Sequence, residues 1–329
     1  MIKRTLYFGN PAYLSCKNNQ LVIGIPNAHG YDKMLGNTVP IEDIGIVVLD
    51  HQQITITQHL ITQLTDNNVA LVNCDEKHLP TGLLLNLSGH TLQQVRFKAQ
   101  LDASIPLKKQ LWQQTIKYKI ANQAAVLNKI GVETQNMKHW ASEVKSGDGE
   151  YHEARAAAYY WSKLFEDEIL EFRRDREGHQ PNGLLNYGYS ILRAVVARGL
   201  VSSGLLPTLG IFHRNQYNAY CLADDIMEPY RPFVDHLVRG IIAKTSNIQV
   251  LNRDIKNQLL RLPTVDVLID EEMSPLFVAT QKTAASLAKC FAGSNWKFVA
   301  NNNSGEMSMS KAGCTSFSSP IKWYINKEG

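Results

Sequence analysis

The spacing of apolar residues changes near residue 90, and this change constrains the fold more than any other feature. Before it, short runs of β-branched and aromatic residues alternate with turn formers, as at 5–8, 13–17 and 20–25. After it, apolar residues recur at helical spacing, first in a long stretch from about 107 to 129. The sequence therefore predicts the α+β class, with an N-terminal β-rich, β-sandwich-like domain followed by an all-α C-terminal domain.

We expect three segments along the chain. Residues 1–90 form the β-rich domain, residues 91–300 form the helical domain, and residues 301–329 form a flexible tail rich in Asn, Ser and Gly. Within the helical domain, Pro229 and Pro232 should interrupt a helix that runs from about 218 to 243. Asp148 or Gly149 should be the N-cap of an earlier helix, the one that contains Glu153.

Composition excludes several classes of protein. Of 329 residues, 44% are apolar, so the chain can bury a core without a disulfide framework. The beginning of the sequence lacks the apolar core of a signal peptide, and no apolar run is long enough to span a membrane. We therefore expect a cytoplasmic protein with no membrane contact. The phosphate-binding GxxxxGK loop and the hydrolase motifs GxSxG and HExxH are absent.

Three short stretches carry side chains suited to a metal ion. HEARAAAYYW at 152–161 contains Glu153 on a helix whose positions 153, 157, 160 and 164 should share one buried face. GIFHRN at 210–215 contains His213, and CLADDIMEPYRP at 221–232 contains Asp224, Asp225 and Glu228. One imidazole with two or three carboxylates is a suitable ligand set for Mg²⁺ or Mn²⁺.

Each of these residues also has a purely structural interpretation. Glu153 could stabilise the positive end of its helix, and His213 could be an ordinary core or surface histidine. The acids at 224–228 could form a solvated turn, and the arginines near them could form ordinary ion pairs. The net charge of +4 permits nucleic-acid binding but does not require it.

Three longer segments carry a resemblance to a known family. They are RTLYFGNPAYLS at 4–15, LNYGYSILRAVVARGLVSSGLLPTLGIFH at 185–213 and DDIMEPYRPFVD at 224–235. Together they resemble the integrase of CRISPR adaptation, the family called CRISPR-associated protein one, over nearly the whole chain. The opening and the DIMEPYRP form resemble the version found in type II systems.

The resemblance implies a set of site residues. Glu153 matches the family's glutamate, His213 matches the histidine of GxxH, and Glu228 closes the D-x-x-[DE] element as the third catalytic metal ligand. Asp225 is a competing ligand or a supporting group, and Asp224 is a weaker alternative. DNA contacts are expected from four arginines, namely Arg193, Arg198, Arg214 and Arg231.

The resemblance also implies an activity and partners. The helical domain would be a Mg²⁺- or Mn²⁺-dependent DNA endonuclease and integrase, which inserts short foreign DNA fragments into a CRISPR repeat array through attack by a 3′-hydroxyl. The β-rich domain would form a homodimer. Expected partners are double-stranded DNA with 3′ ends, CRISPR repeat DNA and a dimer of a small ferredoxin-like protein, with the type II effector nuclease as a further candidate.

Two other functions fit the same residues. A structure-specific nuclease could use the same metal site to cut branched DNA by water attack. A non-catalytic DNA-binding scaffold could use the acids only for ion pairs.

Overall fold

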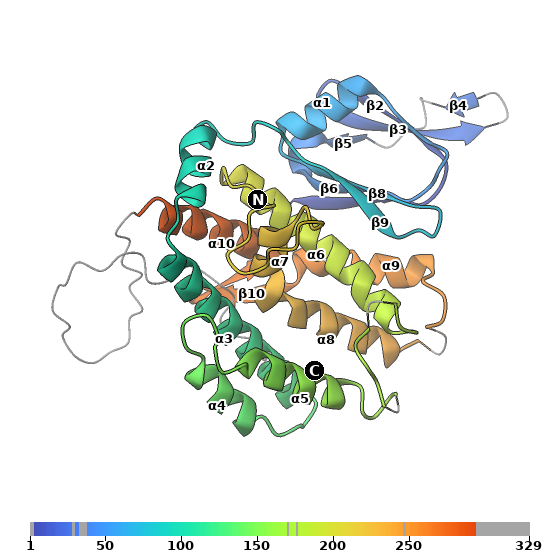
Figure 1. The fold of residues 1–329 in the computed structure, drawn as a ribbon. Helices are drawn as coiled ribbons and strands as arrows, with labels where there is room; N and C mark the ends of the chain where they lie inside the picture. Colours follow the sequence, from blue (N-terminus) through green and yellow to red (C-terminus); the bar gives the residue numbers. More distant parts are fainter. Residues whose placement is uncertain are drawn as a thin grey trace.

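The computed structural model describes residues 3–27, 30–32, 38–169, 171–175, 177–245 and 248–293. A β-rich N-terminal region lies against a larger helical region (Figure 1). The predicted α+β class is therefore confirmed. The predicted tail at 301–329 lies outside the described residues.

The N-terminal region is built from two sheets. Its strands are β1 (Arg4–Phe8), β2 (Ala12–Lys17), β3 (Gln20–Asn27), β4 (Gly30–Asp32), β5 (Thr38–Pro40), β6 (Ile44–Leu49), β7 (Ile54–Ile56), β8 (Ala70–Cys74) and β9 (Pro80–Leu84). The first sheet has the order β1-β6-β8-β9, in which only β9 is antiparallel to its neighbour. The second has the order β4-β3-β2-β7, and β5 also pairs with β3. Helix α1 (Gln58–Asp66) packs on the second sheet through β2, and a 3₁₀ turn, η1 (Ile41–Asp43), precedes β6.

Strand β6 is buried on both faces because it separates two hydrophobic cores. Its side chains alternate between the faces, as the pleat of a strand requires. Ile46 and Val48 join the core that also contains the helices, while Val47 joins a smaller core with Leu14 and Leu60. The first sheet is thus shared by both cores, and a domain boundary near residue 90 stays a prediction.

The helical region is built around two long helices, α3 and α6. Its elements are α2 (Gln93–Leu101), α3 (Ile105–Lys129), α4 (Gln135–Glu143), α5 (His152–Leu164), α6 (Asn182–Ser202), α7 (Cys221–Met227), η2 (Glu228–Tyr230), α8 (Arg231–Ile242), α9 (Arg253–Leu259), η3 (Leu262–Thr264) and α10 (Leu276–Phe291). A hairpin of β10 (Asp266–Ile269) and β11 (Glu272–Pro275), which the sequence pattern did not single out, precedes α10. Helix α6 contacts β8 and β9 and so joins the two regions (Figure 1).

The prolines interrupt the predicted helix at 218–243 as expected. Helix α7 ends at Met227, a 3₁₀ turn covers Glu228–Tyr230, and α8 begins at Arg231. Pro229 cannot donate an intrahelical hydrogen bond, so the backbone tightens at this point. Glu228 therefore projects from a junction between two helices. None of the helices formed by the described residues is long and apolar enough to cross a bilayer.

Candidate metal centre

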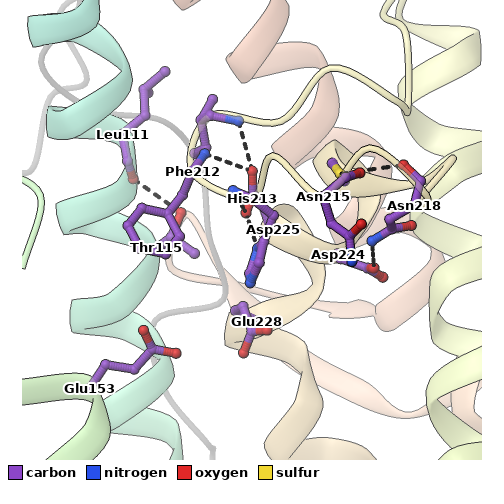
Figure 2. Close-up of polar contacts among 12 residues, drawn as sticks. Leu111, Thr115, Glu153, Phe212, His213, Asn215, Asn218, Asp224, Asp225 and Glu228 are labelled. Atoms are coloured by element: carbon purple, nitrogen blue, oxygen red, sulfur yellow. Dashed lines mark hydrogen bonds and ion pairs between the residues drawn. The ribbon is translucent and has the colours of Figure 1, made fainter.

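Four segments that are distant in the sequence meet at one site. Helix α5 supplies Glu153, helix α3 supplies Lys119, η2 supplies Glu228, and the loop before α7 supplies His213. Figure 2 shows the Glu153 carboxylate directed toward Glu228 and the His213 ring between Asp225 and Glu228. The predicted catalytic residues therefore lie around one position in the helical region.

Lys119 bridges the two glutamates. Its Nζ atom lies 2.6 Å from Oε1 of Glu153 and 2.7 Å from Oε2 of Glu228. Burial by itself would lower the pKa of Lys119, but the carboxylates of Glu228 and Glu153 outweigh burial and raise it. One positive charge is thus held between two carboxylates.

Glu228 is almost fully buried and remains ionised. Burial favours its neutral form, but Arg231 and Lys119 outweigh this effect and lower the pKa of Glu228. The Nε atom of Arg231 lies 3.1 Å from Oε1. The turn itself is held to α3, because Asn122 donates a hydrogen bond of 2.8 Å to the carbonyl oxygen of Pro229. The position of this carboxylate is therefore fixed by both its backbone and its charged neighbours.

Asp225 orients His213. Its Oδ1 atom lies 2.5 Å from Nδ1 of the imidazole and also accepts a hydrogen bond from the backbone N–H of His213. Its Oδ2 atom accepts the backbone N–H groups of Ile211 and Phe212 at 2.7 and 3.0 Å. The hydrogen bond to Asp225 raises the pKa of His213 despite partial burial. Asp225 is fully buried, and both of its carboxylate oxygens accept hydrogen bonds from this loop. The structure therefore favours a supporting role for Asp225 over direct ligation of an ion.

The glycine of GIFH is required by close packing. A Cβ atom on Gly210 would lie 2.4 Å from the carbonyl oxygen of His213 and 2.8 Å from Oδ2 of Asp225. Any larger residue would push the loop away from the carboxylate that organises it. The GxxH spacing therefore reflects how the loop folds around Asp225.

Glu153 is placed by the start of α5. Asp148 accepts hydrogen bonds of 3.0 Å from the backbone N–H groups of His152 and Glu153, so it satisfies two free donors of the first turn. The N-cap residue is Tyr151, so the predicted N-cap at Asp148 or Gly149 is wrong, although the Asp148 side chain still binds the first turn from outside the helix.

The buried face of α5 differs from the predicted face at two of its four positions, where 152 and 156 replace 153 and 157. It consists of His152, Ala156, Tyr160 and Leu164. Glu153 lies at the edge of this face, with 27% of its side chain exposed. A carboxylate at the edge can reach a cation while keeping contact with water, which lowers the cost of its charge.

Asp224 points away from this site. Its Oδ1 atom accepts a hydrogen bond of 2.7 Å from Nε of Arg193, and its Oδ2 atom accepts one of 2.7 Å from Asn218 (Figure 2). Asp224 therefore belongs to an ion pair with Arg193, and it is buried rather than part of the solvated turn that the structural interpretation of the acidic run expected.

Arg198 does not face a DNA-binding surface. Only 6% of it is exposed, its Nε donates to the carbonyl oxygen of Asn68, and its guanidinium lies over the ring of Phe277. Burial lowers the pKa of Arg198 to about 10. The structure thus corrects the expected DNA contact to a packing role between the β-rich region and α10, because the sequence did not reveal the burial of this face of α6.

The other arginines lie near the surface. Arg193 and Arg231 line a cleft of about 460 Å³ next to Glu228, together with Arg174. The ring of Tyr189 lies beneath Arg231 and Arg174, at 4.9 and 5.4 Å from their guanidinium carbons. Arg214 is exposed on the loop that carries His213. Three arginines therefore line the cleft beside the site, together with the acids Asp224 and Glu177.

The residues present fit a divalent cation. The Lys119 ammonium group is itself a cation in contact with both Glu153 and Glu228, so the two carboxylates lie close enough together to share one positive charge. Oε2 of Glu228 is buried and makes no hydrogen bond of good geometry within the described residues. Asp225 engages Nδ1 of His213, which leaves Nε2 as the remaining ring nitrogen. Among the described residues, no three acidic, imidazole or thiol groups lie close enough together to hold an ion in this arrangement. The Lys119 ammonium group occupies the space between Glu153 and Glu228.

Sequence reasoning missed Lys119. It lies on α3, 34 residues before Glu153, and no motif marks it. The only signal in the sequence was indirect. Asp225 and Glu228 are three residues apart on a predicted helix, so a positive partner should lie near them.

Fold and site together define a class, an α+β protein with two carboxylates and an imidazole beside an arginine-lined cleft. A family model described as CRISPR associated protein Cas1 matches residues 6–257. A CRISPR-associated endonuclease Cas1 from Neisseria meningitidis serogroup C (strain 8013) is 36% identical over 288 residues, covering 87% of this chain and 91% of the relative. This chain therefore belongs to the Cas1 family, as the resemblance of its motifs predicted.

Solved structures agree on the fold. A casposase bound to an integration product superimposes with a TM-score of 0.69 at 20% identity, covering 90% of this chain and 92% of that chain. A Cas6-RT-Cas1–Cas2 complex gives a TM-score of 0.68 at 19% identity, covering 88% of this chain and 35% of that chain.

Proposed function

We propose that this chain is a metal-dependent DNA endonuclease and integrase of CRISPR adaptation. It would join the 3′-hydroxyl of a short DNA fragment to a CRISPR repeat by transesterification. Membership of the Cas1 family supports the proposal, and so does the name of the Neisseria relative, a CRISPR-associated endonuclease. The casposase of similar fold is itself bound to an integration product.

One observation carries the proposal. Glu153 and Glu228, which are 75 residues apart in the sequence, share one cation, while His213 lies beside them in an orientation set by Asp225. Two carboxylates and one oriented imidazole suit Mg²⁺ or Mn²⁺. Glu153, Glu228 and Nε2 of His213 are the groups that would hold the ion. When bound, the ion would polarise the scissile phosphate and offset its developing charge.

The chain's own residues have separate tasks. Asp225 keeps Nδ1 of His213 engaged, so Nε2 can ligate or accept a proton. Arg231 fixes the position of Glu228 through its Nε atom. One phosphodiester bond forms as another breaks, so the reaction needs no nucleotide energy source, in agreement with the absence of a phosphate-binding loop.

The cleft beside the site is the proposed path of DNA. Arg193 and Arg231 line it, and Arg214, which directly follows His213, is exposed. Arginine contacts with phosphates release counterions, so DNA affinity should fall steeply with salt.

Partners follow from the same proposal. The β-rich region, residues 1–90, is the proposed homodimer contact, and residues 91–300 form the proposed catalytic domain. Cas2 is the proposed small ferredoxin-like partner, in line with the similar fold in a Cas6-RT-Cas1–Cas2 complex. The type II effector nuclease is a further proposed partner.

The test is a joining assay with a matched pair of variants. Wild-type protein, with Mn²⁺ and a Cas2 partner, should join a labelled 3′-OH fragment to a plasmid that contains a repeat. Glu153→Gln should fold normally and lose joining by at least about a hundredfold, whereas exposed Glu166→Gln should retain it. Full joining by folded Glu153→Gln would refute the proposed site.

The products separate this function from its alternatives. A nicked plasmid without a joined fragment would indicate the structure-specific nuclease. DNA binding without any Mn²⁺-dependent product would indicate the non-catalytic scaffold.

A further inference from the structure

A second hollow lies beside His213, apart from the arginine-lined cleft. Its volume is about 320 Å³, which is at the small end of the range for ligand sites. Its apolar part is formed by Trp112 and Ile105 of α3 and by Ile211 and Phe212 of the histidine loop. None of these side chains belongs to the proposed metal site.

Two aromatic rings form the side of this hollow nearest His213. The rings of Trp112 and Phe212 are parallel, with an interplanar angle of 1° and centroids 4.1 Å apart. Trp112 is buried, whereas 46% of Phe212 is exposed. The indole N–H of Trp112 has no hydrogen-bond partner in the described part of the chain, so the contact between the two side chains is stacking without a hydrogen bond from the indole. An exposed flat ring on a buried one is a platform for a third ring.

Positive side chains form the rest of the lining. They are Lys108 and Lys109 of α3 and Arg214. Gly147 completes the lining, and its N–H donates to the carbonyl oxygen of Lys109, which fixes this loop to α3. No acidic side chain lines the hollow among the described residues. The charge therefore suits an anion, and the rings suit a flat heterocycle.

We infer that this hollow binds one unstacked nucleotide of the DNA next to the reacting phosphate, with its base on Phe212 and its phosphate on Lys108, Lys109 or Arg214. The inference rests on the proposed function and names a specific subsite for it. Base stacking on aromatic side chains combined with basic residues is how proteins bind single-stranded DNA.

The position of the platform relates it to the reaction. Phe212 directly precedes His213, and their ring centroids are 5.5 Å apart in an edge arrangement. The backbone N–H groups of both residues bind Asp225, so the platform and the imidazole move as one unit. A base stacked on Phe212 thus fixes the strand next to the imidazole. That strand is either the 3′ end of the incoming fragment or the repeat strand at the junction.

The experiment measures stacking without catalysis. The full-length protein is bound, in EDTA, to a forked DNA that carries the fluorescent base 2-aminopurine. In one arm the base is the 3′-terminal nucleotide of the fragment, and in the other it flanks the junction in the repeat. Wild-type protein should quench the fluorescence in one arm, which identifies the strand. Absence of quenching in both arms overturns the inference.

Variants test whether Phe212 is the platform. Phe212→Leu keeps an apolar side chain but removes the ring, and it should abolish quenching and weaken binding about tenfold. Phe212→Trp should restore both, which a merely structural role would not require. Replacing the base by an abasic site should weaken wild-type binding about tenfold and leave Phe212→Leu unaffected. Tyr217→Leu, which removes an exposed ring outside the hollow, is the matched control.

The outcomes separate this inference from the proposed function. In one outcome, Phe212→Leu quenches 2-aminopurine and prefers intact over abasic DNA as strongly as wild type does, while wild type joins DNA. The stacking site is then overturned and the proposed function stands. If wild type quenches through Phe212 but forms no joined product with Mn²⁺, the function fails and the stacking site stands.

Discussion

The Nζ atom of Lys119 lies 2.7 Å from Oε2 of Glu228, and the same ammonium group lies 2.6 Å from Oε1 of Glu153. A divalent ion held by both carboxylates would occupy the same space and repel the ammonium group. Lys119 therefore stabilises the two acids in this structure, and the proposed ion could bind both of them only if the ammonium group shifted.

The first prediction concerns Lys119→Met. Without the ammonium group, two neighbouring carboxylates lose their shared cation, and the free energy of unfolding in EDTA should fall by about 3 kcal/mol. Saturating Mn²⁺ should restore most of this loss, because the ion replaces the missing charge. Urea denaturation with and without Mn²⁺ measures both effects.

Lys163→Met is the control for that variant. It removes an ion pair with Glu166 at the surface, so it should change the unfolding free energy by less than about 1 kcal/mol, with or without the ion. If Mn²⁺ stabilised Lys119→Met no more than Lys163→Met, the proposed metal site would be wrong.

The second prediction concerns Asp225→Asn. An amide has one acceptor oxygen where the carboxylate had two, so the loop from Ile211 to His213 loses hydrogen bonds that orient the imidazole. Mn²⁺ affinity measured by calorimetry should fall about 10- to 100-fold in a protein that remains folded. An unchanged Mn²⁺ affinity would show that Asp225 does not act through His213.

The third prediction concerns the contact between the two regions. Nζ of Lys256 lies 2.6 Å from Oδ2 of Asp50, and both side chains are buried. Lys256→Met should destabilise the protein by about 3 kcal/mol because it leaves a buried carboxylate without its cation. The double variant Asp50→Asn/Lys256→Met should lose less than the sum of the single losses, and urea denaturation of all four proteins tests this. Strict additivity would contradict the coupling.

The fourth prediction concerns pH and Asp235. Burial raises the pKa of Asp235 to about 7, although hydrogen bonds from Tyr189 and Tyr160 lower it. A carboxyl group with a raised folded pKa contributes stability below its unfolded pKa of about 3.9, and this contribution is lost as pH rises toward 7. Asp235→Asn cannot ionise, so its stability relative to wild type should increase between pH 4 and pH 8. A pH-independent difference would refute the shifted pKa.

The fifth prediction contrasts two arginines of α6. Arg193 lines the cleft, so Arg193→Gln should lower the slope of log affinity for DNA against log salt by about 1. Arg198 is buried, so Arg198→Gln should leave that slope unchanged and lower the melting temperature instead. Equal slopes for the two variants would contradict the assigned DNA path.

Much of the fold could be predicted from local sequence. Strands β1, β2 and β3 cover the runs at 5–8, 13–17 and 20–25, and the prolines of EPYRP mark the junction between α7 and α8. These features depend on neighbouring residues, namely β-branched runs and a missing backbone donor. The hairpin of β10 and β11 was not predicted, because its short strands lack a strong alternating pattern.

The sequence by itself determined the change from strand to helical spacing, the family, and the identities of Glu153, His213 and Glu228 as candidates, because these are carried by local spacing and motifs. Only the tertiary structure decided that Lys119 bridges the acids, that Asp225 serves the histidine loop, and that Arg198 packs while Arg193 lines a cleft. The physical reason is that burial and charge pairing are set by side chains distant in the chain. Such partners become neighbours only when the helices pack.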